Sequence, residues 1–228
     1  MAQFERILII GCGNMGGAML AGWLAAGMAP ERFTVMDPLL AEAPAGVRLL
    51  RELPDEAFDA LLLGVKPQML GDVAPALTAL AGSGTTVLSI LAGVELASLA
   101  ARFPHAGALV RIMPNLAAAI GKSPVALVAA RLDDAGRAAV TALMQPLGAP
   151  EWLPEAQFDA VTALAGSGPA FVYRFIDALA SGAQALGMDE AQAQRLALAA
   201  LLGAALLAPA PPHSPGELAR RVASPGGT

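Results

Sequence analysis

The sequence predicts an α/β protein in which a doubly wound, mostly parallel sheet, residues 1–153, is followed by an all-helical domain, residues 154–228. Three observations support this prediction. Short apolar runs alternate with helical patterns in the first part, strand signals vanish after Trp152, and a glycine-rich turn follows the first apolar run. Because such alternation is typical of parallel β-α-β units, we expect strands that are buried on both faces.

The first apolar run, residues 7–10, stops at three glycines spaced G-x-G-x-x-G. This spacing is the fingerprint of a Rossmann-type dinucleotide-binding strand, turn and helix. The glycines permit a tight turn, a close approach of the backbone to a pyrophosphate and close packing of the helix, whose N-terminal amides bind the phosphates. We expect the whole turn to bind the cofactor: Gly11, Cys12, Gly13, Asn14, Met15 and Gly16. The alternative is a glycine turn with a purely structural role.

The residues after the turn favour cofactor binding. A helical pattern, residues 14–26, follows at once, and a second strand pattern, residues 33–36, ends in Asp37. An acidic residue roughly 20 positions after the last glycine is where the fingerprint places a hydrogen bond to the adenosine ribose. We therefore expect Asp37 to belong to the cofactor site.

The remaining patterns of the first part alternate as the fold class requires. Strands are predicted at residues 59–65, 85–91, 108–112 and 125–129, and helices at residues 68–81, 95–102 and 133–147. Asp133 fits the N-cap of the last helix.

The second part contains helical patterns at residues 158–165, 170–186, 190–207 and 215–222. Gly187 fits a C-terminal cap, because glycine adopts the left-handed conformation found there. Asp189 with Gln192, and Ser214 with Glu217, fit N-terminal capping patterns.

Two strand ends carry polar residues at the edge where doubly wound sheets bind ligands, outside the carboxyl ends of the strands. Val65, Lys66 and Pro67 follow one strand, and we expect them to line the nicotinamide side of the cofactor. Asn115 follows another strand, where its amide could bond the nicotinamide ring or the substrate. The alternatives are an ordinary lysine at a strand end and a polar turn residue.

Two further segments interrupt or follow helical patterns. Residues 166–169, Gly-Ser-Gly-Pro, lie inside an apolar helical pattern, where glycine costs about 1 kcal/mol and proline about 3 kcal/mol. We expect this break to expose backbone beside the cofactor; the alternative is a kink that lets two helices pack. Residues 224–228, Ser-Pro-Gly-Gly-Thr, predict either an anion-binding nest or a disordered terminus.

Composition excludes several classes of protein. The net charge of −5 and the pI near 5.0 exclude a nucleic-acid partner, because phosphate binding requires clustered Lys and Arg. The lone Cys12 excludes a disulfide within the chain and favours a reducing, cytoplasmic compartment. The uncharged stretch 7–30 contains several glycines and has a strand pattern followed by a helix pattern, so we expect no membrane span.

The sequence favours a reaction that needs neither a metal ion nor a catalytic triad. No metal-ligand spacing surrounds His105 or His213, so no metal site is predicted. No recognised arrangement of a serine, a histidine and a carboxylate is present either. Hydride transfer from a cofactor to a polarised, easily protonated C=N bond requires neither, because the cofactor supplies the chemistry and the protein supplies placement.

Six motifs together resemble those of pyrroline-5-carboxylate reductase, the last enzyme of proline biosynthesis. They follow one another along nearly the whole chain, at residues 11–16, 65–67, 113–115, 166–171, 213–218 and 224–228. The G-S-G-P-A-F and S-P-G-G-T motifs are the most specific, since many dehydrogenases share the glycine fingerprint. The resemblance implies NAD(P)H-dependent reduction of 1-pyrroline-5-carboxylate to L-proline, a small-molecule substrate, by homodimers formed through the helical domain, with further assembly into a decamer.

The resemblance also implies roles for single residues. Ser167 and Thr228 would be the catalytic residues. Gly168 would bind the substrate, and Ser224, Gly226, Gly227 and Thr228 would bind its carboxylate. Family members continue past this point with a further threonine and a helical segment, so the resemblance implies a chain truncated at its C-terminus.

Cofactor preference and two other functions remain open. Relatives that prefer NADPH usually carry small hydroxyl or basic residues after the second strand, whereas Asp37 would repel a 2′-phosphate. We therefore expect a lean towards NADH, with use of both cofactors. The alternative functions are another imine or β-hydroxyacid reductase on the same scaffold, and a non-catalytic nucleotide-binding scaffold.

Overall fold

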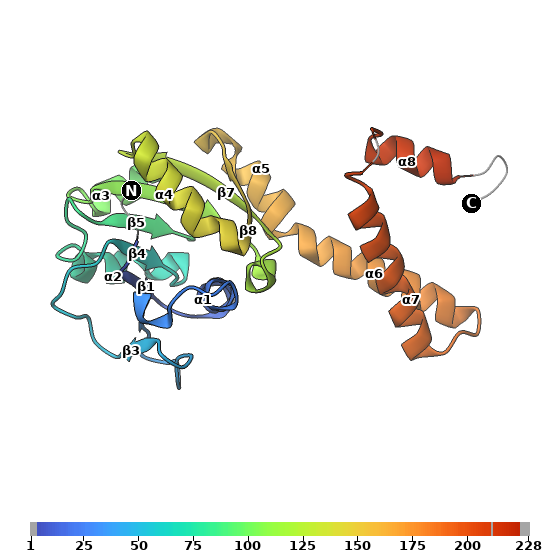
Figure 1. Ribbon diagram of the computed structural model, residues 1–228, viewed down its shortest axis with the longest axis horizontal. Helices are drawn as coiled ribbons and strands as arrows, with labels where there is room; N and C mark the ends of the chain where they lie inside the picture. Colours follow the sequence, from blue (N-terminus) through green and yellow to red (C-terminus); the bar gives the residue numbers. More distant parts are fainter. Residues whose placement is uncertain (1–3, 211, 224–228) are drawn as a thin grey trace. The chain divides into compact units, whose positions relative to one another are not determined.

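The computed structural model describes residues 4–210 and 212–223 (Figure 1). The chain divides into two compact units, residues 1–167 and residues 168–228. The first unit is a sheet with helices on its faces, and the second unit is helical. Strands end at Trp152, and the helical stretch 155–167 still belongs to the first unit.

Within the described residues, the first unit contains one eight-stranded sheet. Its strands are β1 (Ile7–Ile10), β2 (Phe33–Met36), β3 (Arg48–Leu50), β4 (Ala60–Leu63), β5 (Thr86–Ser89), β6 (Ala108–Met113), β7 (Ser123–Ala130) and β8 (Gly148–Trp152). They lie in the order β3-β2-β1-β4-β5-β6-β7-β8, and all neighbours are parallel except the antiparallel pair β6 and β7. The predicted doubly wound, mostly parallel sheet is confirmed.

Helices of several kinds connect and follow the strands. The α-helices are α1 (Asn14–Ala25), α2 (Leu70–Leu77), α3 (Leu96–Arg102), α4 (Asp134–Met144), α5 (Phe158–Val161), α6 (Gly168–Ala185), α7 (Glu190–Leu207) and α8 (Pro215–Val222). The short 3-10 helices are η1 (Pro30–Arg32), η2 (Pro67–Met69), η3 (Leu116–Ile120), η4 (Gln145–Leu147) and η5 (Glu155–Gln157). A π-helix, η6 (Thr162–Gly166), follows α5.

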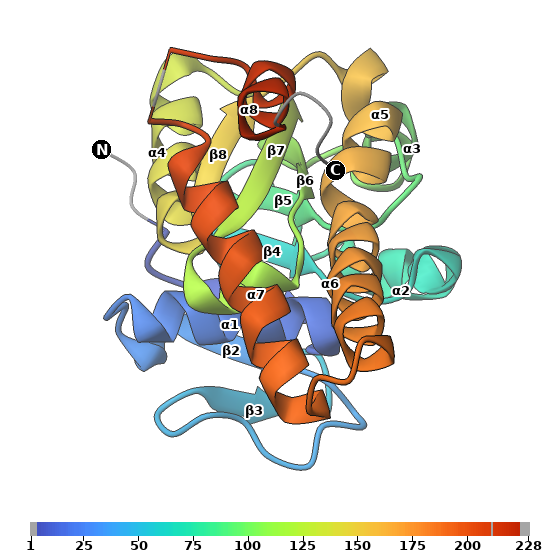
Figure 2. The ribbon, with the colours of Figure 1, turned by 90° about the vertical axis from the view of Figure 1, so that its right-hand side faces the viewer.

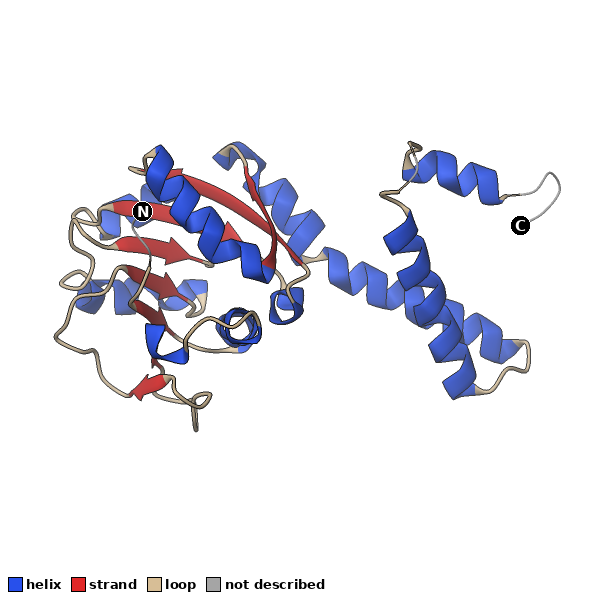
Figure 3. Ribbon diagram, in the orientation of Figure 1, coloured by secondary structure: helices blue, strands red, loops and turns tan. Residues whose placement is uncertain are grey.

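The central strands supply two large cores, one on each face of the sheet. Helices cover both faces (Figure 3). In β1, Ile7 and Ile9 pack in one core, Leu8 and Ile10 pack in the other, and all four are fully buried. Side chains of α1 and α4 join the first core, and side chains of α2 and α3 join the second. Burial on both faces is why these strands are uniformly apolar.

Trp23 shows how α1 is fixed to the sheet. Its ring is fully buried and stacks on Phe33 of β2, with ring centroids 5.3 Å apart. Its Nε1 donates a hydrogen bond to the carbonyl of Leu143 in α4, at 2.7 Å. One side chain therefore joins β2 to both helices of this face.

Two strands were not predicted, and both lie at the edges of the sheet. β3 has three residues, of which Arg48 is exposed and the other two are half-buried, so it lacks an apolar run. β8 contains Pro150 and the exposed Glu151. An edge strand accepts proline because one side of its backbone pairs with no neighbour.

The second unit contains α6 and α7, which form a hairpin (Figure 2). The predicted caps are confirmed: Gly187 has a φ of +95°, and the Asp189 side chain accepts a hydrogen bond from the Gln192 amide. The two helices pack through Ala180, Ala193 and other small residues. In the described part of the chain, no helix combines the length and the apolar character needed to cross a membrane.

Candidate active site

The turn between β1 and α1 has the geometry that the glycine fingerprint predicts. Gly11 has a φ of +81°, in the left-handed region, and its amide donates to the Met36 carbonyl at 2.9 Å. A Cβ on Gly16 would lie 2.9 Å from the carbonyl oxygen of Gly11. Because a backbone atom cannot easily move aside, glycine at both positions lets α1 begin directly against the strand.

The N-terminus of α1 is open. No side chain caps it, its first turn carries no charged residue, and the Gly17 amide makes the first helical bond, to the Gly13 carbonyl at 2.8 Å. Gly13 and Asn14 are exposed, and among the described residues, the chain neighbours of Gly13 aside, no atom lies within 4 Å of the position of a Gly13 Cβ. The first amides of the helix therefore face free space at the positive end of its dipole, an arrangement that fits a pyrophosphate.

Asp37 joins the turn to the loop after β2. Its Oδ2 accepts a hydrogen bond from the Cys12 amide at 2.8 Å, and its Oδ1 accepts bonds from the amides of Leu39 and Leu40. Burial acts to raise the pKa of Asp37, but these three bonds and the positive charge of Arg51 outweigh it and lower the pKa. The side chain is therefore a carboxylate at neutral pH, placed beside the cofactor turn.

Cys12 contributes its backbone rather than its thiol. Burial, together with the negative charge of Asp37, raises the pKa of the thiol to about 11. The thiol is therefore protonated at neutral pH, which makes it a poor nucleophile. The residue is 8% exposed, so its thiol is buried beside the turn.

Residues 65–67 lie at the same edge of the sheet as the turn, because β4 pairs in parallel with β1. A Cβ on Gly11 would lie 3.0 Å from Cγ1 of Val65, so these two residues are in contact. Lys66 is exposed and extended, with a ψ of 143°, as expected of a residue before proline. Pro67 begins η2.

Asn115 lies at this edge as well, but the fold already uses most of its side chain. Its Oδ1 caps η3 by accepting a bond from the Ala117 amide at 2.9 Å, and its Nδ2 donates to the Ala165 carbonyl at 3.0 Å. One Nδ2 hydrogen is left for a ligand. Asn115 therefore connects the end of β6 to the π-helix η6.

The predicted break at residues 166–169 is the end of this π-helix. The Ser167 amide donates to the Thr162 carbonyl at 3.0 Å, and α6 begins at Gly168. The Ser167 side chain is exposed. Single π-helical turns are frequent at functional sites. The other predicted substrate residues, Ser224, Gly226, Gly227 and Thr228, lie outside the described residues.

An ion pair near this edge was not predicted. Arg111, in the middle of the apolar strand β6, is 5% exposed, and its Nη1 lies 2.6 Å from Oε1 of Glu155. Both residues line a cavity of about 410 Å³ with Gly93, Glu95, Ala156 and Asp159. A charged residue inside an apolar strand is the signal that marks Arg111, whereas no sequence pattern marks Glu155.

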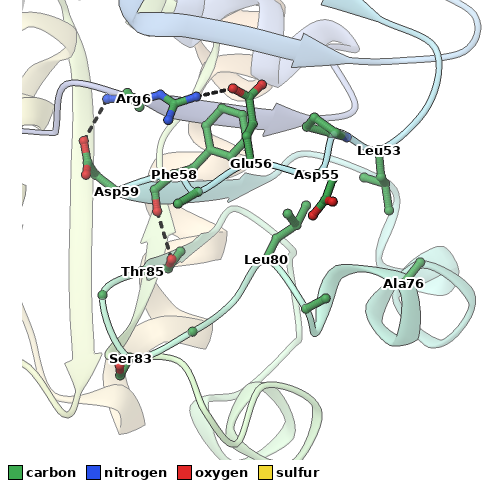
Figure 4. Close-up of a pocket in the computed structure, with 15 residues that line it drawn as sticks. Arg6, Leu53, Asp55, Glu56, Phe58, Asp59, Ala76, Leu80, Ser83 and Thr85 are labelled. Carbon is green, nitrogen blue, oxygen red and sulfur yellow. Dashed lines mark hydrogen bonds and ion pairs between the residues drawn. The ribbon is translucent and has the colours of Figure 1, made fainter.

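A larger cavity, of about 730 Å³, lies away from these residues. Figure 4 shows it at the amino ends of β1, β4 and β5, lined by Arg6, Phe58 and Thr85 among others. Several of its polar groups already bind one another: Arg6 pairs with Glu56, and Thr85 Oγ1 donates to the Phe58 carbonyl at 2.8 Å. Because parallel sheets bind ligands at the carboxyl ends of their strands, the glycine-turn edge is the better candidate site.

Comparisons with known proteins agree with this geometry. Residues 155–228 match the family model "Pyrroline-5-carboxylate reductase dimerisation", and residues 6–93 match "NADP oxidoreductase coenzyme F420-dependent". The chain is 36% identical to pyrroline-5-carboxylate reductase of Methanosarcina acetivorans, over 98% of this chain and 86% of the relative.

Solved structures agree with both matches. The 1-pyrroline-5-carboxylate reductase of Streptococcus pyogenes has a TM-score of 0.83 and 30% identity, covering 98% of this chain and 86% of the other. The pyrroline carboxylate reductase of Plasmodium falciparum, solved with NADP bound, has a TM-score of 0.88 and 20% identity, which supports the fold. It covers 100% of this chain and 87% of the other. The chain therefore belongs to the pyrroline-5-carboxylate reductase family.

Proposed function

We propose that this chain reduces 1-pyrroline-5-carboxylate to L-proline by hydride transfer from NAD(P)H, the last step of proline biosynthesis. The relatives named above carry this activity in their names, and they align with nearly the whole chain. The structural observation that carries the proposal is the turn from Gly11 to Gly16, which presents an open helix N-terminus at the carboxyl edge of a parallel sheet.

The turn fits a dinucleotide cofactor, which supplies the hydride when bound. The amides of residues 13–16 would hold the pyrophosphate, and Asp37 would accept a hydrogen bond from the adenosine ribose through the lone pairs that its backbone bonds leave free. Val65, Lys66 and Pro67 would line the nicotinamide side. The carboxylate of Asp37 disfavours a second negative charge nearby, so NADH is the preferred cofactor.

The substrate is a small anionic ring with a polarised C=N bond. Ser224, Gly226, Gly227 and Thr228 would bind its carboxylate, because successive amides of a Gly-Gly loop with hydroxyl donors form an anion-binding nest. Ser167 and Gly168 would lie beside the reacting bond. The hydroxyls of Ser167 and Thr228 would act as donors there, since reduction of the imine carbon requires a proton on its nitrogen.

The family model that covers residues 155–228 supports a homo-oligomer. We propose a homodimer formed by α6 and α7, which present large apolar side chains to solvent in the single chain, including Phe171 and Phe175. A decamer built from such dimers is the larger assembly that we propose. A cytoplasmic location fits the protonated, buried Cys12 and the absence of a second cysteine.

The test is oxidation of NADH on addition of 1-pyrroline-5-carboxylate, with two matched variants. Gly16→Ala places a methyl group 2.9 Å from the Gly11 carbonyl, whereas Gly71→Ala, also in the first turns of a helix, meets no atom within 4 Å. We expect the KM for NADH to rise on the order of tenfold or more in Gly16→Ala, about 1.4 kcal/mol, and to stay unchanged in Gly71→Ala.

Three results separate the candidate functions. Turnover of this substrate supports the proposal. Turnover only of other imines or of β-hydroxyacids favours another reductase on the same scaffold. Binding of NADH without turnover of any of them favours a non-catalytic nucleotide-binding protein.

A further inference from the structure

Arg111 is an anomaly in the core of the sheet unit. It lies in β6 between Val110 and Ile112, which are both buried, and its own exposed fraction is 5%. A buried charge is costly unless it is paired and hydrogen-bonded. Arg111 finds an ion-pair partner and an aromatic ring in one short stretch of the chain. Its Nη1 lies 2.6 Å from Glu155 Oε1, and its guanidinium lies 4.7 Å from the centroid of the Phe158 ring.

Glu155 makes a second bond with the same oxygen. Its Oε1 accepts from the amide of Leu96, the first residue of α3, at 2.7 Å. The N-cap of α3, Glu95, provides no side-chain bond of its own. A carboxylate from a distant part of the chain therefore caps α3 while it neutralises Arg111.

The stretch that begins with Glu155 leads to the predicted catalytic residue. It continues through α5 and the π-helix η6 to Ser167, and single π-helical turns are rare and concentrate at functional sites. Near its end, the Ala165 carbonyl accepts a bond from Asn115 Nδ2 at 3.0 Å. Residues 155–167 are therefore held at both ends. Their first residue, Glu155, pairs with Arg111 of β6, and Ala165, near their end, is bonded by Asn115, which lies two positions after β6.

We propose that Arg111 and Glu155 are positioning residues for the reduction, which fix residues 155–167 relative to the carboxyl edge of the sheet and so set the place of Ser167 beside the nicotinamide. The inference rests on the proposed function. Neither residue needs to touch the substrate. Their effect is geometric, and a misplacement of about 1 Å by distant residues can lower a rate on the order of 100-fold.

Three variants test this role. Glu155→Gln keeps an oxygen acceptor for the Leu96 amide but removes the charge that Arg111 requires. Arg111→Lys keeps the positive charge but loses the planar group that packs on Phe158 and bonds the carboxylate. Glu56→Gln is the matched control, because Glu56 pairs with Arg6 and Arg48 in the same unit, at the amino edge of the sheet.

With NADH and 1-pyrroline-5-carboxylate, we expect kcat to fall roughly 10- to 100-fold in Glu155→Gln and Arg111→Lys. The dissociation constant for NADH stays unchanged, because the glycine turn is intact. The kinetic isotope effect with NADH deuterated at the transferred position rises, because hydride transfer becomes slower relative to product release. The control keeps wild-type kcat.

The contrary outcomes are equally definite. A folded Glu155→Gln or Arg111→Lys with wild-type kcat and a lowered melting temperature would mean that the ion pair serves stability alone. If kcat falls as much in Glu56→Gln as in Glu155→Gln and Arg111→Lys, the inference is also overturned. A wild-type chain that turns over no 1-pyrroline-5-carboxylate would refute the proposed function, and the positioning role with it.

Discussion

The two units of the chain bury their apolar side chains to very different extents. In the sheet unit, large residues such as Trp23 and Phe103 are fully buried between strands and helices. In the helical unit, the described residues that are buried are alanines, Ala180, Ala193 and Ala197. Phe171 and Phe175 of α6 are 70% and 55% exposed.

This difference indicates where each unit obtains its stability. The sheet unit has two large cores of its own and a smaller cluster that includes Phe158, so its apolar side chains are buried within the unit itself. A hairpin of two helices held by alanines buries little apolar surface, so most of its stabilisation has to come from outside the hairpin. A second copy of the chain, as proposed above, would supply it.

The largest expected effect comes from a substitution in the core of the sheet unit. Trp23→Ala removes the ring that stacks on Phe33 and leaves the Leu143 carbonyl without its donor. We expect a loss of about 3 to 5 kcal/mol in the free energy of unfolding, measured by urea denaturation. A loss below about 1 kcal/mol would mean that this core is not the main source of stability.

The next effect concerns the exposed face of the helical unit. Phe175→Asp should raise the dissociation constant of the dimer on the order of 100-fold, about 3 kcal/mol, as measured by sedimentation. Leu39→Asp is the control, since Leu39 is 92% exposed but lies in the sheet unit. If both variants have the same dimer dissociation constant as the wild type, the interface lies elsewhere.

A smaller effect concerns cofactor choice. Asp37→Ser should raise the use of NADPH relative to NADH on the order of tenfold, about 1.4 kcal/mol, because the carboxylate that repels a 2′-phosphate is gone. The ratio of the two kcat/KM values measures this. Asp59→Ser is the control: Asp59 also accepts two backbone amides, of Glu5 and Arg6, but at the amino edge. If the ratio of the two kcat/KM values is unchanged in Asp37→Ser, Asp37 does not contact the adenosine ribose.

The smallest effect compares one cap in each unit. The side chains of Asp133 and Asp189 both accept an amide hydrogen three residues ahead, at 2.8 and 3.0 Å. Each change to alanine should cost about 1 kcal/mol. Because the helical unit depends on association, the melting temperature of Asp189→Ala should depend more steeply on protein concentration than that of Asp133→Ala. Identical concentration dependence would contradict the proposed difference between the units.

Local patterns in the sequence predicted much of the fold. β1, α1 and the turn between them follow from four apolar residues and three glycines, because each residue there has one dominant local constraint. The caps of α4, α7 and α8 were also predictable, since Asp133, Asp189 and Ser214 each bond an amide three residues away.

The elements that were not predictable depend on contacts between distant residues. The edge strand β8 pairs with β7 although it contains Pro150. Glu155 caps α3 from 59 positions further along the chain. The π-helix η6 contains no residue that excludes an ordinary α-helix, and its Ala165 carbonyl is held by Asn115. Propensity carries no information about such contacts, because they form only once the sheet exists.

The first strand also bears on how this family can change during evolution. β1 faces two cores with alternate residues and leads directly into Gly11. An insertion or deletion of one residue there would exchange the two faces of the strand and displace the cofactor turn in the same event. Conservative exchanges among aliphatic residues leave both intact. Variation in length should therefore accumulate in surface loops such as residues 38–47, and the length of residues 7–16 should stay constant among active homologues.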